Sequence, residues 1–155
     1  MDTNQIRNIL SSDCKLSISF EGVFASDQIP KFCEQPAALV CNLDPHNRPG
    51  SHWVAMYINN GVGEYFDSYG LAPIDVNFVN FLNNNCTSWN YNKIELQAFN
   101  SEVCGHYCIW FLSERARGNF SWKGFKKGDG DKNDRVVVKK LRNRFGNETQ
   151  NASVG

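Results

Sequence analysis

Apolar residues recur along this chain with two periodicities, one typical of helices and one typical of strands. Spacings of three and four residues predict helices in three stretches, with Thr3 as the cap of the first. These expected helices cover residues 3–10, 75–83 and 103–112. Asn100, Ser101 and Glu102 precede the third stretch and are of types that favour helix starts. That stretch is apolar nearly all round, so we expect its helix to be buried at the centre of the fold.

Strands are expected over residues 38–42, 52–58, 64–69 and 93–98. The second strand is apolar on both of its alternating faces, which predicts a central place in a sheet that is covered on both sides. Asn60-Gly61 follows it and favours a two-residue hairpin turn, because both residues tolerate positive φ. In that register paired residue numbers sum to 121, so His52 faces Tyr69 and has Asp67 as a diagonal neighbour on the same face.

These elements predict one α+β domain in which a central mixed sheet packs against a buried helix. The chain has 155 residues, of which 41% are hydrophobic and 13% aromatic, and this is enough for one core. No repeat or long linker divides it, so we expect a single domain over residues 1–145 and a flexible C-terminal tail over residues 146–155. The apolar runs are too short for a membrane span, and residues 1–10 lack the pattern of a signal peptide.

The chain contains six cysteines, which could form three disulfides in a secreted domain. Because it is also rich in Phe, Trp, Leu and Val, its core needs no covalent cross-links. We therefore favour reduced thiols in an intracellular protein that is not secreted.

Charge is distributed unevenly along the chain, although the net charge is zero. Residues 1–114 hold 5 basic and 12 acidic groups, whereas residues 115–144 hold 11 basic and 3 acidic groups. A solvated C-terminal face is the simpler explanation of this asymmetry. A contact with a polyanion is the alternative.

Cys104 stands at the expected start of the buried helix, where unsatisfied backbone N–H groups and the helix dipole favour thiolate over thiol. His52 could accept the thiol proton and later protonate a leaving amine, with Asp67 holding its tautomer. Gln97 ends an expected strand seven residues before Cys104, and its amide N–H could join the Cys104 backbone N–H in an oxyanion hole. Taken singly, each residue has an ordinary structural explanation, such as a buried cysteine or a satisfied core histidine.

The spacing Cys104-x-His106-x-Cys108 does not predict a metal site. On a helix, residues 104 and 108 share a face while residue 106 points about 200° away, at about 100° per residue, so the three side chains cannot converge. The sequence also lacks a glycine-rich phosphate loop and a Gly-x-Ser-x-Gly elbow. We expect no metal and no small-molecule cofactor.

Four segments together resemble the ordered signature of the adenain family, the adenovirus-type cysteine proteases. They are Gly50-Ser-His52-Trp53-Val-Ala, then Tyr65-Phe66-Asp67-Ser68-Tyr-Gly70, then Gln97, and Cys104-Gly105 seven residues later. Similar enzymes occur in related DNA viruses and in large virus-like DNA transposons. The order His, Asp or Glu, Gln, Cys is also that of the SUMO-specific proteases of the same clan. The resemblance extends from about Met1, through residues 20–30, to about Gly118.

The resemblance implies a papain-like or adenain-like cysteine protease fold and a role for each residue of the signature. His52 would be the general base, Asp67 the acid that orients it, Gln97 the oxyanion donor and Cys104 the nucleophile. Trp53 would form a wall beside the histidine. Adenovirus enzymes commonly have Glu at the position of Asp67, whereas the SUMO-specific relatives have Asp, so this residue does not fix the subfamily.

The resemblance also implies two activators. Adenovirus proteases are activated by a short capsid-derived peptide that can form a disulfide with a cysteine 18 residues before the nucleophile, and that position is Cys86 here. They also use DNA as a cofactor, and the basic segment after Arg115 offers partners for phosphates. The candidate DNA-binding residues are Lys123, Lys126, Lys127, Lys139, Lys140, Arg142 and Arg144.

The leading interpretation is a monomeric thiol endopeptidase that cleaves viral or virus-like precursor capsid and core proteins during virion maturation. We expect it in the virion and in the nucleus or cytoplasm of the host cell. Its partners would be a protein or peptide substrate, viral DNA and a capsid-derived peptide, with no membrane. The first alternative is a deconjugase of ubiquitin-like modifiers that uses the same residues. The second is a catalytically inactive nucleic-acid-binding protein on the same fold.

Overall fold

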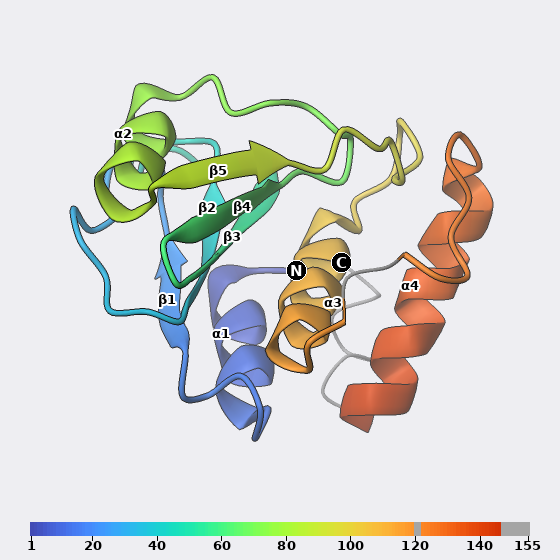
Figure 1. Ribbon diagram of the computed structural model, residues 1–155. Helices are drawn as coiled ribbons and strands as arrows, with labels where there is room; N and C mark the ends of the chain where they lie inside the picture. Colours follow the sequence, from blue (N-terminus) through green and yellow to red (C-terminus); the bar gives the residue numbers. More distant parts are fainter. Residues whose placement is uncertain (120–121, 147–155) are drawn as a thin grey trace.

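The computed structural model describes residues 1–119 and 122–146 (Figure 1). Its elements follow the order α1 (Thr3–Ser12), β1 (Phe20–Phe24), β2 (Ala37–Asn42), β3 (Trp53–Asn59), β4 (Val62–Phe66), α2 (Val76–Asn85), β5 (Ser88–Tyr91), α3 (Cys104–Ala116) and α4 (Gly130–Phe145). Apart from Gly146, which follows α4, the tail expected over residues 146–155 lies outside the described residues. Among the helices described, none is long and apolar enough to cross a membrane.

The five strands form one mixed sheet in the order β1-β2-β3-β4-β5. β1 and β2 are parallel, as are β4 and β5, whereas β3 runs antiparallel to both of its neighbours. The α+β class and the central place of β3 are therefore confirmed. The sequence pattern does not predict β1 or β5, which form the two edges of the sheet.

Side chains alternate between two cores along the central strands. Ala38 and Val40 of β2 face the larger core, which α1, α3 and α4 cover, while Leu39 and Cys41 face the smaller core under α2. Figure 1 shows the three helices gathered on one side of the sheet and α2 on the other. The unbroken apolar pattern of β3 predicts this burial on both faces.

The β3–β4 hairpin has the expected turn and register. Asn60 and Gly61 take φ values of 52° and 75°, as a type I′ turn requires. Ala55 pairs with Phe66, so paired numbers sum to 121 as predicted. β4 ends at Phe66 rather than at residue 69, and Asp67 is therefore the first residue beyond the strand.

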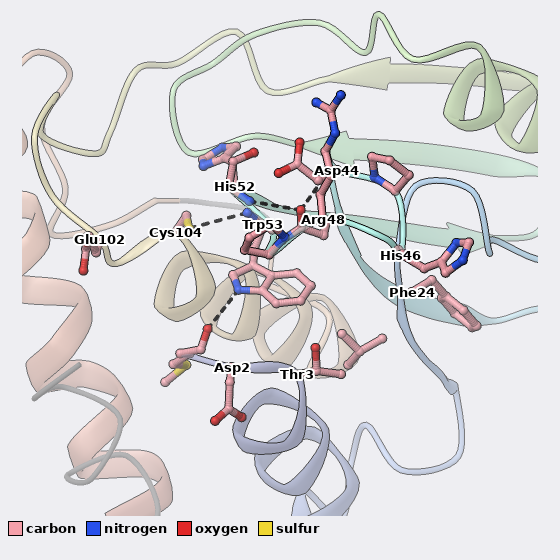
Figure 2. Close-up of a pocket in the computed structure, with 18 of the residues that line it drawn as sticks. Asp2, Thr3, Phe24, Asp44, His46, Arg48, His52, Trp53, Glu102 and Cys104 are labelled. Carbon is pink, nitrogen blue, oxygen red and sulfur yellow. Dashed lines mark hydrogen bonds between the residues drawn. The ribbon is translucent and has the colours of Figure 1, made fainter.

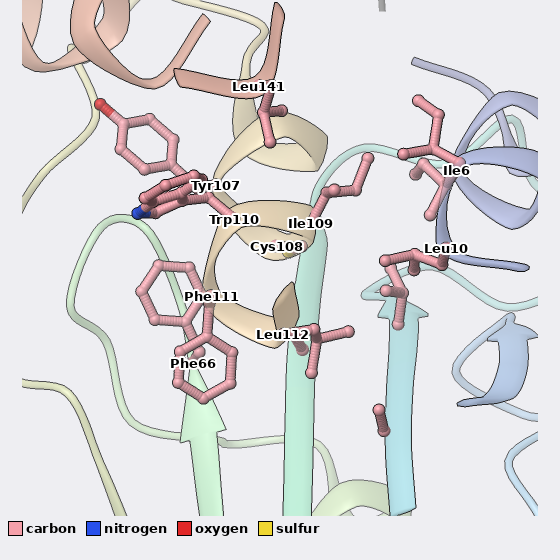
Figure 3. Packing of buried hydrophobic residues seen from close by; sticks show 14 of the residues in the cluster. Ile6, Leu10, Phe66, Tyr107, Cys108, Ile109, Trp110, Phe111, Leu112 and Leu141 are labelled. Carbon is pink, nitrogen blue, oxygen red and sulfur yellow. The ribbon is translucent and has the colours of Figure 1, made fainter. Parts of the chain in front are cut away.

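α3 is the buried central helix that the sequence predicts, and residues 104–113 are all buried. Phe111 stacks on Phe66 of β4 with ring centroids 4.8 Å apart. Leu10 of α1 and Leu141 of α4 reach the same helix from two other sides (Figure 3). Packing on every side fixes the axis of α3 and therefore the place of its N-terminus, where Cys104 lies.

Two helix caps differ from the sequence prediction. α1 is capped by Asp2 rather than Thr3, because the Asp2 carboxylate accepts the Gln5 N–H at 2.8 Å and the Gln5 side chain accepts the Asp2 N–H at 2.9 Å. α3 follows Val103 without a side-chain cap, so the polar residues 100–102 do not close its first turn. The first N–H groups of α3 therefore remain available to a group that approaches the N-terminus of the helix.

The strand expected over residues 93–98 is wrong. β5 lies earlier in the chain, and Lys93 takes a left-handed φ of 57°, which is incompatible with an extended strand. The chain then runs along Ser68, whose carbonyl accepts the N–H groups of Leu96 and Gln97 at 2.9 and 3.1 Å. As a result, Gln97 lies in an irregular segment rather than at the end of a strand, and it is 2% exposed.

α4 is a 16-residue helix that the sequence pattern does not predict. It buries Asn133, Val137 and Leu141, which lie four residues apart on one face. The C-terminal half of the basic segment is therefore a helix packed on α3, and its exposed charges lie on the remaining faces.

Candidate active site

A cleft of about 660 Å³ opens at the N-terminal end of α3 (Figure 2). Cys104, His52, Trp53 and Gln97 all line it. They come from the start of α3, the loop before β3, β3 itself and the irregular segment after β5. Asp67 lies behind His52, so the structure brings the five residues of the predicted signature together.

Cys104 is the first residue of α3 and is 8% exposed. The Trp53 main-chain N–H donates to its sulfur at 3.5 Å, so the start of β3 and the start of α3 meet at this point. A thiol in this place has the positive end of the helix dipole and a backbone donor beside it. Both favour the thiolate.

His52 connects Cys104 to Asp67. Its Nε2 lies 2.9 Å from Asp67 Oδ1, and 12% and 4% of the two side chains are exposed. Because a carboxylate can only accept, Nε2 carries the proton in this bond, and Nδ1 is the ring nitrogen left to exchange a proton with Cys104. The imidazole also stacks on Tyr69, with ring centroids 5.0 Å apart and planes at 24°.

Asp67 is held in one orientation although it lies just past the end of β4. Its Oδ1 also accepts the Tyr69 N–H at 2.8 Å. The Asn92 side-chain oxygen accepts the Asp67 N–H at 3.1 Å, and the Asn92 amide donates to the Asp67 carbonyl at 2.8 Å. These bonds fix the direction in which the carboxylate points toward His52.

The electrostatics of the site favour an imidazolium paired with a thiolate. Burial lowers the pKa of His52, but hydrogen bonds to Asp67 and Cys104 and the charges of these groups outweigh burial and raise that pKa to about 9. Burial likewise raises the pKa of Cys104, but the hydrogen bond to His52 and the N–H of Trp53 outweigh it and hold the pKa below its usual value.

All six cysteines are free thiols, and four of them are poorly suited to nucleophilic chemistry. Burial raises the pKa of Cys33 to about 11 and also raises the pKa of Cys41, Cys86 and Cys108. A higher pKa leaves less thiolate at neutral pH. The pKa of Cys104 is instead lowered, so Cys104 holds more thiolate than these four cysteines.

Gln97 is oriented by two hydrogen bonds from its side chain. Its Oε1 accepts the Ser68 hydroxyl at 2.6 Å, and its Nε2 donates to the Ser101 carbonyl at 2.8 Å. A primary amide has two N–H protons, so one proton of Nε2 is left beside the cleft that Gln97 and Cys104 both line. This proton and the backbone N–H groups at the start of α3 are the candidate donors to an oxyanion.

Trp53 lines the cleft next to His52, the position expected for a wall. Its indole Nε1 donates to the Met1 carbonyl at 3.1 Å. Met1 in turn packs over Gly105, where an added Cβ would lie 3.2 Å from the Met1 Cβ. The first residues of the chain therefore belong to the cleft wall, which the sequence pattern did not indicate.

Cys86 lies away from the cleft, at the C-terminal end of α2. It packs against the smaller core together with Cys33. Its sulfur would lie 2.5 Å from a Cβ added at Gly63, so the strand beneath it comes very close. The structure does not bring Cys86 together with the other candidate residues, and its role as a peptide-linkage site stays a prediction.

The seven candidate DNA-binding residues divide into two groups. Arg144 forms an ion pair with Glu114 at 2.7 Å, and both Arg144 and Lys140 lie over the Trp110 ring, with their charged groups 4.2 and 5.1 Å from its centroid. These two cations are therefore engaged within the fold. The exposed members are Lys123, Lys126, Lys127, Lys139 and Arg142. DNA binding itself stays a prediction.

Within residues 1–119 and 122–146, no three His, Cys, Asp or Glu side chains converge as metal ligands. His106 is 1% exposed, and neither of its ring nitrogens has a hydrogen-bond partner there. Burial lowers its pKa to about 4, so the ring is neutral at physiological pH.

Three supporting residues were missed by the sequence reasoning, namely Asn92, Ser68 and Ser101. Ser68 stands beside Asp67 in the segment that carries the resemblance, and this adjacency is the one signal that could have pointed to it. Asn92 and Ser101 lie in polar loop segments, where their residue types are common. Asn92 acts on Asp67, 25 residues earlier, and Ser101 acts through its carbonyl, which any residue type could supply.

Comparison with known proteins gives partial likenesses. No family model matches the chain. Over 92 residues it is 36% identical to a protein of Acanthamoeba polyphaga mimivirus named "Putative thiol protease R355", and the match spans 52% of this chain and 30% of that relative. Among solved structures, the ASFV pS273R protease is similar, with a TM-score of 0.43 and 23% identity over 64% of this chain and 42% of that one. Membership of the adenain family stays a prediction.

Proposed function

We propose that this chain is a cysteine endopeptidase that cleaves peptide bonds through Cys104, with His52 and Asp67 completing a triad and Gln97 in the oxyanion hole. The observation that carries the proposal is the convergence of Cys104, His52 and Asp67, with His52 Nε2 2.9 Å from the Asp67 carboxylate and with the pKa of Cys104 lowered by its pairing with His52. The mimivirus relative, which is named as a thiol protease, supports the same class of reaction.

In the first half of the reaction the Cys104 thiolate attacks the carbonyl carbon of the scissile bond. The carbonyl π electrons move to oxygen, and the oxyanion is received by Gln97 Nε2–H and the Cys104 backbone N–H. The His52 imidazolium then donates its proton to the leaving amine as the C–N bond breaks. The products are a free amine and a thioester on Cys104.

In the second half a water molecule attacks the thioester, and His52, now neutral, takes the proton from that water. The second tetrahedral intermediate collapses, and the carboxylic acid leaves while the Cys104 thiolate is restored. Asp67 stays ionised and keeps the imidazole in the tautomer that faces the sulfur.

The substrates proposed here are precursors of capsid or core proteins of a virus or virus-like element, cleaved as the virion matures. The cleft is open and continues past Trp53 to Phe24, His46 and Arg48, which suits an extended peptide (Figure 2). The viral source of the thiol-protease relative agrees with this class of substrate. Action in the virion and in the host nucleus or cytoplasm follows from such substrates.

DNA and a capsid-derived peptide are proposed as further partners. DNA phosphates would contact the five exposed candidate residues, and the peptide would reach Cys86 at the end of α2. Neither partner is needed for the chemical steps above, because the triad and the oxyanion donors all come from the folded chain.

The test uses a peptide library made from a whole proteome, incubated with the wild-type chain and with Cys104→Ser. New N-termini are identified by mass spectrometry. We expect cleavage at a defined set of bonds by the wild type and none by the variant. A second arm offers a ubiquitin-like modifier fused through its C-terminus to a reporter, and cleavage of this fusion alone would favour the deconjugase. Equal cleavage of the peptide library by the wild type and by Cys104→Ser would contradict the proposal.

A further inference from the structure

We propose that α4 positions Gln97 for catalysis, and that Gly130, Asn133 and Asp134 are the residues through which it does so. The inference rests on the proposed role of Gln97 as an oxyanion donor. It gives the basic C-terminal segment a task in the reaction that is separate from any contact with DNA.

The segment that carries Gln97, residues 94–101, has no helix or strand of its own, and we call it the Gln97 loop. A loop without a ladder of backbone hydrogen bonds keeps its shape through contacts with its neighbours. An oxyanion donor works only when it is held at the place where the negative charge develops. The contacts of the Gln97 loop therefore bear directly on rate.

Gly130, the first residue of α4, touches the Gln97 loop through its backbone. An added Cβ at this glycine would lie 2.5 Å from the Ala98 Cα and 2.6 Å from the Ala98 nitrogen. No side chain other than hydrogen fits at such a distance. The N-terminal end of α4 is thus pressed against the residue that follows Gln97.

Asn133 holds the residue that precedes Gln97. Its side chain is completely buried, and its Nδ2 donates to the Leu96 carbonyl at 3.0 Å and to the Lys126 carbonyl at 2.7 Å. Its Oδ1 accepts the Lys126 N–H at 2.9 Å. A buried amide with all of these bonds satisfied is costly to disturb, because any partner left alone remains unpaired in the interior.

Asp134 connects the Gln97 loop to the helix that carries Cys104. Its Oδ1 accepts the Ala98 N–H at 3.3 Å and the Tyr107 hydroxyl at 2.8 Å. Tyr107 lies one turn after Cys104 on α3 and is fully buried. One carboxylate oxygen therefore ties the loop of the proposed oxyanion donor to the helix of the proposed nucleophile.

α4 thus fixes Leu96 and Ala98, the residues on both sides of Gln97, while the Ser68 carbonyl accepts the N–H of Gln97 itself. With both neighbours anchored, the backbone of Gln97 is held in place beside the cleft. Loss of these anchors would move the amide, whereas Cys104 and His52 keep their own contacts with the Trp53 N–H and with Asp67.

The experiment compares two reactions of Cys104 that differ in their need for an oxyanion hole. A peptide aldehyde is attacked by the sulfur at its carbonyl carbon, and the electron pair goes to oxygen, which requires the oxyanion donors. Iodoacetamide alkylates the sulfur: the thiolate attacks its saturated carbon, an S–C bond forms and iodide leaves, which requires the thiolate and no oxyanion donor. The inhibition constant of the aldehyde and the alkylation rate are measured together with kcat and KM.

Asp134→Ala is expected to weaken aldehyde binding about tenfold and to lower kcat by a similar factor, with KM and the alkylation rate unchanged. The effect should be smaller than the ~10²–10³-fold loss caused by removing an oxyanion donor itself, for which Gln97→Ala is the reference. Val137→Ala is the matched control on α4, because Val137 is completely buried in the larger core. It should lower Tm and leave both reactions unchanged.

A double-mutant cycle tests whether Asp134 acts through Gln97. In the Gln97→Ala background, Asp134→Ala should cause no further loss of aldehyde affinity. An equal further loss would overturn the inference, as would wild-type aldehyde affinity in the single variant Asp134→Ala. If Asp134→Ala does not fold, Tyr107→Phe removes one hydrogen bond of the same network and must show the same pattern on a smaller scale.

The two proposals fail in different ways. A wild-type chain that does not bind the aldehyde would contradict the protease proposal and this inference with it. A wild-type chain that binds the aldehyde, loses affinity in Gln97→Ala and keeps it in Asp134→Ala would leave the protease proposal standing and overturn the positioning role of α4.

Discussion

His52 and Tyr69 stack ring on ring at the open end of the β3–β4 hairpin, with centroids 5.0 Å apart. Neither residue belongs to a strand, yet both occupy the positions that the strand register assigns to a pair. The stacked tyrosine restricts the plane of the imidazole, which must reach Cys104 on one side and Asp67 on the other.

We therefore expect Tyr69→Leu to lower kcat by about 10- to 100-fold, because a freely rotating imidazole spends less time aligned with the sulfur. Tyr69→Phe keeps the ring and should retain most of the activity. Peptide hydrolysis by the two variants, measured at saturating substrate, checks this expectation. A Leu variant as fast as the wild type would show that stacking does not position the imidazole.

His52→Ala should remove nearly all activity, because it deletes the group that exchanges protons with the substrate. Asp67→Asn should leave a measurable rate, since it changes the tautomer and the local charge while the imidazole remains. Initial rates of peptide hydrolysis at several enzyme concentrations distinguish the residual activity of Asp67→Asn from that of His52→Ala. Similar rates in both variants, close to that of the wild type, would place the chemistry elsewhere.

The pH profile of kcat/KM should rise as Cys104 loses its proton, at a pH below the usual range for a thiol. It should fall again as His52 loses its proton near the pKa of about 9, because the imidazolium that protonates the leaving amine is then gone. Asp67 contributes to the raised pKa of His52, so Asp67→Asn should move the falling limb toward lower pH. A falling limb at the same pH in this variant would contradict the assigned pair.

DNA binding is tested most clearly with the exposed cations. Replacing Lys126, Lys127, Lys139 and Arg142 by Gln should flatten the dependence of log affinity on log salt by up to about four units, since each neutralised phosphate releases about 0.9 counterion. Lys140→Gln is the control, because this ammonium lies over Trp110. Titrations at three salt concentrations give both slopes. An unchanged slope in the fourfold variant would rule out DNA contact through these residues.

The sequence allowed the three central strands and the contact of His52 with Asp67 to be predicted. The reason is that local signals agree there, because Asn60-Gly61 sets the turn, the turn sets the register, and the register brings His52 to Asp67. The buried helix was predictable because residues 103–112 are apolar nearly all round. In both cases the informative residues are close together in the chain.

The elements that were missed depend on contacts that a local pattern does not contain. β5 and the Gln97 loop are set by the positive φ of Lys93 and by the Ser68 carbonyl, which lies in another segment. α4 begins with polar residues, and its buried Asn133 is recognisable as a core residue only once Leu96 is seen beside it. Sequence periodicity treats such an asparagine as an exposed position.

Covalent labelling can show directly whether Cys104 is the nucleophile. The folded chain is treated with a substoichiometric peptide electrophile directed at thiols, and the modified cysteine is located by mass mapping, in the wild type and in His52→Ala. We expect modification at Cys104 ahead of the other five cysteines, and a much slower reaction in the variant. Labelling at another cysteine, or a rate at Cys104 that does not depend on His52, would contradict this role of Cys104.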